Sequence, residues 1–302
     1  MNLSTVMLSQ VAAHLYWAGR QLMRAEDISR VALAYNDISL TAQHQNFADW
    51  KNLLSALEQS APNSGEGGAL RHLLAARTNP NSVRTCVYLA RENMRVSRSL
   101  LPEEIWGQIT QLHEAIETAP SRLYSRRHRV RQLRDIVMSC RAIIGVLLTS
   151  LRRGGTRTFL NIGILLECAD MNCRLLRYAM PDDDQDDDPA QDSVRWRRVL
   201  DAFGLTNMYR VGEYGSIRRE LAVDFIIADT AMPRSMLFCL VRLQTLLADL
   251  PNNTKALEEC SFTLCSARRM RGGQGDIAAQ LERTQNQLAK LHAVIAQTYF
   301  LS

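Results

Sequence analysis

Helical periodicity runs along the chain and constrains its fold more than any other feature. Apolar residues recur every three or four positions, as at Leu15, Ala18, Leu22 and Ala25, and runs that alternate apolar and polar residues are absent. Fifteen glycines and eight prolines in 302 residues are too few for the many turns of a β-sandwich or barrel. The sequence therefore predicts an all-α protein with about ten helices.

Start and stop signals place these helices. A first helix begins near Ser9, Asn79-Pro80 supplies a cap and a first-turn proline for a helix to about Ser99, and Pro102 opens another helix. The remaining helices are expected at about 123–150, 158–178, 193–205, 214–229, 233–249, 254–270 and 276–300. Six aspartates between two prolines repel one another in the segment 181–190, which predicts a flexible acidic loop, and the glycine-rich residues 271–275 predict a turn.

A faint internal repeat divides the chain. At an offset of 144 residues Gly19 aligns with Gly163, and at an offset of 153 residues Ser82 aligns with Ser235. The acidic tract lies between the two matches, so an inserted loop explains the larger offset. We therefore expect a duplication, with a first helical half (1–150) and a second helical half (151–302) packed as one body.

Charge is distributed unevenly between the halves. Only three of the 36 basic residues are lysines, and the excess of positive charge lies in the first half, notably between Arg122 and Arg134. Arginine binds carboxylates and phosphates bidentately, so this segment is suited to an anionic partner, although an arginine-rich composition also follows from a GC-rich genome. It lacks the interleaved aromatic residues of a single-strand nucleic-acid platform, and we expect no nucleic-acid partner.

Cysteine usage and hydropathy limit the class of protein. The seven cysteines are odd in number and form no CxxC pair, so we expect buried thiols instead of disulfides or a cysteine zinc site. The longest apolar run, 142–148, is too short to span a bilayer, and the N-terminus does not resemble a signal peptide. A cytoplasmic protein without a membrane partner is expected.

One face of the first helix carries an unusual set of side chains. Trp17, Arg20, Arg24 and Asp27 follow i, i+3, i+7, i+10 spacing, which places them together, opposite the Leu15/Leu22 stripe. Such a face suits a phosphate, a carboxylate tail or an acidic partner surface. The alternative is that both arginines form internal ion pairs. Gly19, in the middle of this helix, indicates close approach by another helix, and Gly163 repeats the feature.

A second candidate set lies at 90–95. Arg91 and Arg95 share a helix face, and Glu92 pairs with Arg95 at i+3. These residues either contribute to a polar site shared with Arg20 and Arg24 or form ordinary exposed ion pairs. Phosphate-binding loops, nucleophile elbows and paired histidine ligands are absent from the sequence, so no metal site and no cofactor of the chain's own are expected.

The run from Met7 to Glu26 and the blocks 79–84, 90–95 and 232–235 together resemble the bacterial alpha-E domain family, an all-helical domain with a Glu-Arg motif. Members of that family are typically encoded beside, or fused to, circularly permuted ATP-grasp proteins. The resemblance implies an accessory subunit of an ATP-grasp amide ligase in peptide synthesis or modification, acting by protein–protein interaction. ATP and magnesium would then belong to the partner, and an acidic peptide is a further candidate ligand.

The chain departs from the family at its motif. Met23-Arg24 stands where the family has Glu-Arg, and the second copy reads Glu167-Cys168. One half keeps the arginine and the other keeps the glutamate. We therefore predict that Arg24 and Glu167 form a single pair across the halves, with side chains closer than about 8 Å.

Two alternatives to the partner role stay open. The first is a helical enzyme acting on a carboxylate- or phosphate-bearing substrate, with Glu167 as candidate catalytic residue. It predicts a pocket where Arg20, Arg24 and Arg91 converge on a carboxylate of raised pKa. The second is a purely structural helical scaffold.

Overall fold

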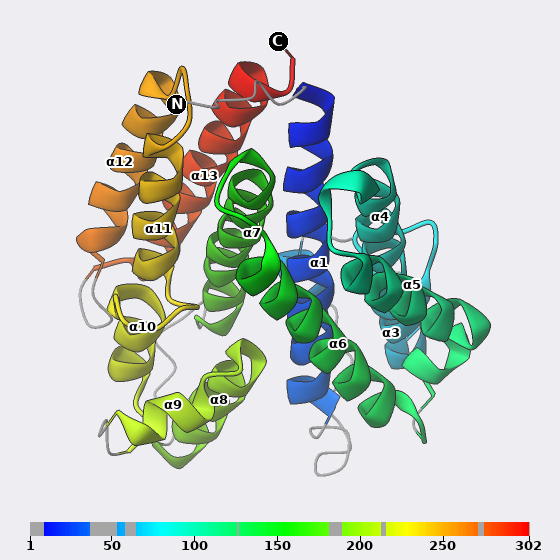
Figure 1. Ribbon diagram of the computed structural model, residues 1–302. Helices are drawn as coiled ribbons and strands as arrows, with labels where there is room; N and C mark the ends of the chain where they lie inside the picture. The colour runs from blue at the N-terminus through cyan, green and yellow to red at the C-terminus, as the bar shows by residue number, and fades with distance from the viewer. Residues whose placement is uncertain are drawn as a thin grey trace.

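The computed structural model describes residues 9–36, 53–57, 65–125, 127–180, 189–212, 216–270 and 275–301, and no strand occurs in these ranges. The all-α prediction is confirmed for them (Figure 1). The α-helices are α1 (Ser9–Asn36), α3 (Gly65–Ala75), α4 (Val83–Val96), α5 (Glu103–Thr118), α6 (Arg129–Ser150), α7 (Gly155–Ala179), α8 (Pro189–Phe203), α9 (Thr206–Val211), α10 (Arg219–Ala228), α11 (Met236–Ala248), α12 (Thr254–Arg268) and α13 (Ile277–Tyr299).

Two long helices form the centre of the molecule. The 28-residue α1 packs against α7, α4, α6 and α8, and the 25-residue α7 packs against α1, α13 and α11 (Figure 1). Both are buried over most of their circumference, because each carries small or apolar residues on several faces. The expected two-faced first helix is therefore a central helix, and its polar side chains lie inside the protein.

Glycine allows these two helices to touch. A Cβ added to Gly19 would lie 2.2 Å from the carbonyl oxygen of Leu160, and one added to Gly163 would lie 2.1 Å from that of Tyr16. Neither backbone oxygen can move away without shifting its helix. The predicted close approach at both glycines is confirmed. The contacts advance together along both helices, from Tyr16 with Gly163 to Arg24 with Glu167, so α1 and α7 run in the same direction.

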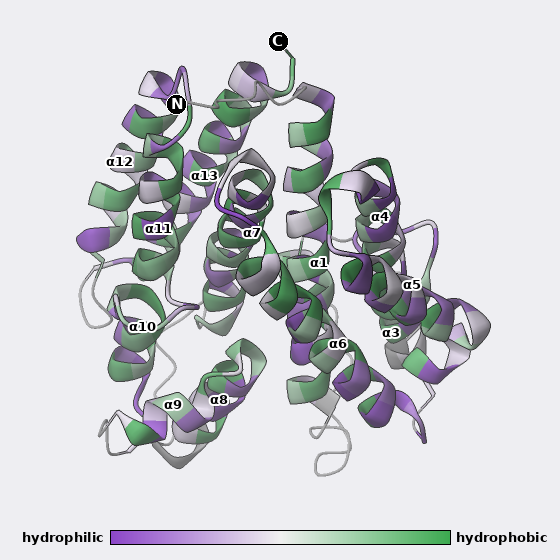
Figure 2. Ribbon diagram, viewed as in Figure 1, coloured by the Kyte–Doolittle hydropathy of each residue, from purple (hydrophilic) through white to green (hydrophobic). Residues whose placement is uncertain are grey.

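Outer helices cover this pair on two sides. Helices α4, α5 and α6 pack in sequence beside α1, and α11, α12 and α13 pack in sequence beside α7, while α8, α9 and α10 lie at one end (Figure 1). Hydrophilic and hydrophobic residues alternate around the outer helices, as expected for helices with one face in solvent (Figure 2). A single set of buried apolar residues runs through both halves.

Several predicted boundaries are wrong. Ser82, not Asn79, caps α4, because its hydroxyl accepts a hydrogen bond from the Thr85 amide while Asn79 and Pro80 form the preceding turn. The helix expected from 123 begins at Arg129, after a 3-10 turn (Pro120–Leu123). Of the expected acidic loop 181–190, residues 181–188 lie outside the described residues, and α8 already begins at Pro189, which suits a first helical turn.

The state of the cysteines and the hydropathy of the helices agree with most of the expectations from the sequence. All seven cysteines are free, and six are buried, but Cys265 is exposed on α12, contrary to the expectation for that residue. Most of the glycine-rich turn predicted at 271–275 lies outside the described residues. In the part of the chain that the structure describes, none of the helices combines the length and hydropathy needed to cross a bilayer.

Candidate functional site

A buried group of polar contacts lies where α1 and α7 meet. Arg24 reaches Glu167 with two nitrogens, Nε at 2.5 Å from Oε1 and Nη2 at 2.9 Å from Oε2, and Arg20 Nε donates to Oε2 at 2.7 Å. Arg24 also donates to Asn81 Oδ1 at 2.5 Å, from the turn before α4. We call Arg20, Arg24 and Glu167 the central clasp. The predicted pairing of Arg24 with Glu167 is confirmed.

Burial and charge together fix the ionisation of the clasp. The Glu167 side chain is 0% exposed and that of Arg20 is 10% exposed. Burial alone would raise the pKa of Glu167, but the guanidinium groups of Arg24 and Arg20 outweigh it and lower that pKa to about 2. Burial likewise disfavours the charged form of Arg20, yet Glu167 raises its pKa above the ordinary value. All three groups are therefore charged at neutral pH, and Glu167 is a poor proton donor or acceptor there.

The clasp continues toward the surface through aromatic side chains. The guanidinium of Arg20 lies 5.5 Å from the centre of the Trp17 ring and 5.9 Å from that of Tyr16, both within cation–π range. The Tyr16 hydroxyl lies 2.7 Å from Nδ1 of His292 on α13. Burial, followed by the charge of Arg20, lowers the pKa of His292 to about 4, so the ring is neutral at pH 7. Half-buried Trp17 thus forms the outer edge of the clasp.

Asp27 belongs to a different polar group. It pairs with Arg30 on its own helix and with Arg234 from the turn before α11. We call this group, together with Glu26 and Arg141 of α6, the second ion cluster; Arg141 Nε lies 3.0 Å from Glu26 Oε1. The predicted face of Trp17, Arg20, Arg24 and Asp27 is therefore divided between two sets of internal contacts.

The second candidate set lies away from the clasp. Arg91 Nη1 donates to Glu92 Oε1 at 2.7 Å, and Arg95 Nε donates to Glu92 Oε2 at 2.9 Å. The Arg91 guanidinium also stacks at 5.0 Å from the centre of the Trp106 ring on α5. No contact in the described ranges joins these three residues to the clasp arginines. Arg91, Glu92 and Arg95 therefore form ion pairs with one another, which was the alternative to a polar site shared with Arg20 and Arg24. A binding role for these three residues stays a prediction.

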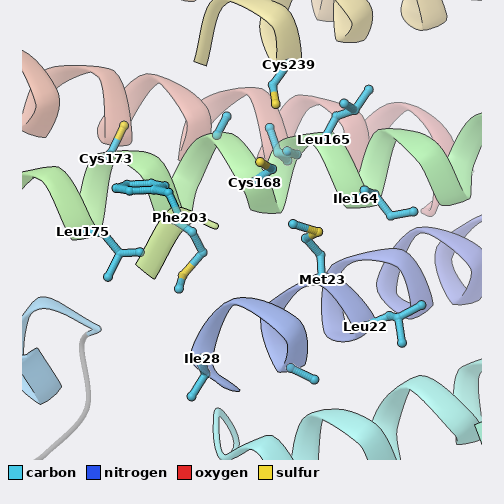
Figure 3. Close-up of a cluster of buried hydrophobic side chains, with 14 of the residues drawn as sticks. Leu22, Met23, Ile28, Ile164, Leu165, Cys168, Cys173, Leu175, Phe203 and Cys239 are labelled. Atoms are coloured by element: carbon cyan, nitrogen blue, oxygen red, sulfur yellow. The ribbon is translucent and has the colours of Figure 1, made fainter. Parts of the chain in front are cut away.

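Apolar side chains occupy the positions where the Glu-Arg motif is incomplete. Met23 on α1 and Cys168 on α7 are 3% and 4% exposed. Figure 3 shows the Met23 side chain pointing from α1 toward Cys168, with Cys239 of α11 on the other side of Cys168. These positions neighbour Arg24 and Glu167 in the sequence, but their side chains add to the hydrophobic core.

Other polar groups of the interior were not predicted as site residues. Asp170 accepts from Arg174 Nε at 2.8 Å and lies 4.0 Å from Arg20, while Arg234 and Asn81 reach the central helices from the turns before α11 and α4. The internal repeat could have indicated Asp170 and Arg174, because they align with Glu26 and Arg30 at the offset of 144. Among the described residues, no group of three or more His, Cys, Asp or Glu side chains is placed to hold a metal ion.

Comparison with known proteins gives one result. No curated protein and no solved structure matches the chain. A family model covers residues 7–300, and its family is described as a predicted alpha-helical domain with a conserved ER motif. A helical body in which the retained glutamate and arginine meet across the two central helices agrees with that description. Because the match spans nearly all of its length, the chain belongs to the Alpha-E family.

Proposed function

We propose that this chain is a non-catalytic binding subunit that docks onto a circularly permuted ATP-grasp amide ligase in a peptide synthesis or modification system. The genomic association of alpha-E proteins with such ligases names the partner class. The observation that carries the proposal is a set of exposed arginines in the turns before α6 and in the first turns of α6, namely Arg122, Arg127, Arg131 and Arg134, which we call the α6 arginine surface. None of these guanidinium groups forms an ion pair within the described ranges, so all four are available to an acidic partner.

The docking surface differs from the one that the sequence suggested. Arg20 and Arg24 are bonded to Glu167 inside the protein, and a partner would have to break the clasp to reach them. The α6 arginine surface requires no such rearrangement. A charge-complementary contact of this kind accelerates association and weakens as salt screens it.

Co-purification with a coexpressed ATP-grasp protein tests the proposal directly. We expect a complex with a dissociation constant in the micromolar range or below, and weaker binding as ionic strength rises. Replacing Arg131 and Arg134 with Gln should weaken binding about tenfold and reduce the salt dependence. A control with Gln at the exposed Arg269, directly after α12, and at the exposed Arg283 of α13 removes the same amount of charge elsewhere and should bind normally. Absence of a complex at micromolar concentrations, or equal loss in both variants, would refute the proposal.

The enzyme alternative receives less support from the geometry. It requires Arg20, Arg24 and Arg91 to converge on a carboxylate of raised pKa, but Arg91 stacks on Trp106 and the pKa of Glu167 is lowered. Burial does raise the pKa of Asp170, but that carboxylate is bonded to Arg174 inside the protein.

We infer further that the two halves arose by duplication, and that the motif joins them. In the first half α4 and α6 pack against α1 and α5 packs against both of them, and in the second half α11 and α13 pack against α7 and α12 packs against both of them. The turns before α4 and α11 repeat the same hydrogen bonds at an offset of 153. Ser82 donates to Ala76 O and caps α4, as Ser235 donates to Asp229 O and caps α11.

A duplicated motif would give two Glu–Arg pairs across the interface. Arg24–Glu167 is one of them, and Met23–Cys168 occupies the equivalent of the other. The retained pair would then hold the binding subunit in one shape instead of performing chemistry.

A further inference from the structure

A hollow of about 460 Å³ opens at the start of α7, and none of its lining residues belongs to the clasp or to the α6 arginine surface. Its walls come from two elements that are far apart in the sequence. The turn after α6 and the first turns of α7 form one wall, and the C-terminal part of α11 forms the other. A ligand held there would contact both α7 and α11, which lie in the second half of the chain.

Positive charge dominates this hollow. Arg153 and Arg157 line it from the α7 side, Arg242 lines it from α11, and Asp249 is the single carboxylate among the lining residues. Arg153 and Arg242 are exposed and form no ion pair within the described residues. Arg157 uses one nitrogen, Nη1, to donate to the carbonyl oxygen of Leu151 at 3.3 Å. Guanidinium groups on opposite walls can therefore bind one anion from two sides.

Two further donors point to the same ligand chemistry. Thr158 is 9% exposed and lines the hollow, and its hydroxyl has no hydrogen-bond partner among the described residues. No side chain caps the first turn of α7, which follows Gly154, so the amide groups at the positive end of this 25-residue helix stay available. An unpartnered hydroxyl on a residue that is nine-tenths buried and lines the hollow is available as a donor to a ligand there.

We propose that this hollow binds the phosphate group of a small phosphorylated molecule. A tetrahedral dianion presents several acceptor oxygens at once, which matches guanidinium groups on two walls, one hydroxyl and the helix terminus. A carboxylate offers only two oxygens in one plane and would leave part of this donor set unused. The volume exceeds that of a bare phosphate, so it also admits the organic group that carries it.

Calorimetric titration with inorganic phosphate and with phenyl phosphate tests the site, in buffers of matched ionic strength and with acetate as the competing carboxylate. We expect saturable binding of both phosphates and none, or at least tenfold weaker binding, of acetate. Tighter binding of phenyl phosphate would assign the site to a phosphate ester, and equal binding would assign it to the free ion. Absence of saturable phosphate binding would overturn the proposal.

Single substitutions separate the site from general charge. Arg242→Gln and Thr158→Val should each weaken phosphate binding about tenfold, because each removes a donor to a charged acceptor. Arg152→Gln is the matched control, since Arg152 is exposed in the same turn but does not line the hollow. It should leave affinity unchanged, whereas equal weakening by Arg152→Gln and Arg242→Gln would overturn the proposal. Asp249→Asn, which removes the opposing carboxylate, should tighten binding.

This inference is independent of the docking proposal. Phosphate binding is measured on the isolated chain, and ligase binding is measured with the partner present. Failure of one experiment therefore leaves the other unaffected.

Discussion

Replacing Glu167 with Gln tests whether the central clasp holds the two halves together. The substitution keeps the shape of the side chain but removes the charge that Arg20 and Arg24 share. Removing one partner from a buried ionic group leaves uncompensated charge, which costs about 3–5 kcal/mol. The lowered pKa gives a similar magnitude, because the difference between 4.5 and about 2 corresponds to roughly 3 kcal/mol. We expect the free energy of unfolding at pH 7 to fall by about this amount in urea titrations.

The pH dependence gives the clasp prediction a second readout. Because folding lowers the pKa of Glu167, its contribution to stability is fully present above about 4.5 and is lost as the pH falls toward about 2. The difference in unfolding free energy between the wild type and Glu167→Gln should therefore be largest at neutral pH and shrink below pH 4.5. Unfolding curves measured between pH 7 and pH 3 check this.

A control substitution distinguishes the clasp from ordinary surface charge. Glu282, whose side chain is 58% exposed, pairs with Arg177 at 3.7 Å, and Glu282→Gln should change stability by less than about 0.5 kcal/mol. A loss below about 1 kcal/mol for Glu167→Gln, or a difference that does not vary with pH, would refute the idea that this carboxylate joins α1 to α7.

Three further predictions concern the interface and the caps. Gly163→Ala places a methyl group 2.1 Å from a backbone oxygen and should destabilise the protein by about 3 kcal/mol or more. The control Gly145→Ala places a methyl group with no atom within 4 Å and should stabilise the protein by up to about 1 kcal/mol. Thermal unfolding of both variants checks this. Met23→Glu alone should destabilise by several kcal/mol because it buries an unpaired carboxylate, and adding Cys168→Arg should recover at least about 1 kcal/mol in a double-mutant cycle. Ser235→Ala removes the cap of α11 and should cost about 1–2 kcal/mol in denaturant unfolding.

The helical class and most of the helices could be predicted from the amino-acid sequence. Apolar spacing and a shortage of turn residues are local properties, and they lead to the same helices whether or not these pack together. Glycines in helix interiors are informative in a second way. A glycine there lowers helix stability, so its presence indicates that a neighbouring segment packs too closely for a side chain. Gly19 and Gly163 therefore predicted that another helix approaches closely at each position, and the structure shows that the two helices approach each other. The incomplete Glu-Arg motif likewise predicted the pairing of Arg24 with Glu167.

Tertiary structure alone decided which faces are buried. Periodicity divides a helix into an apolar and a polar side, but α1 is enclosed by four neighbours, so its polar side also lies inside. The arginines expected to meet a partner therefore meet Glu167, and Asp27 meets Arg234, a residue more than 200 positions away. The choice of partner in such ion groups depends on the packing of several helices at once, and the hollow between α7 and α11 also exists only where these helices pack. No local pattern encodes either, because both exist only after helices that are distant in the sequence pack together.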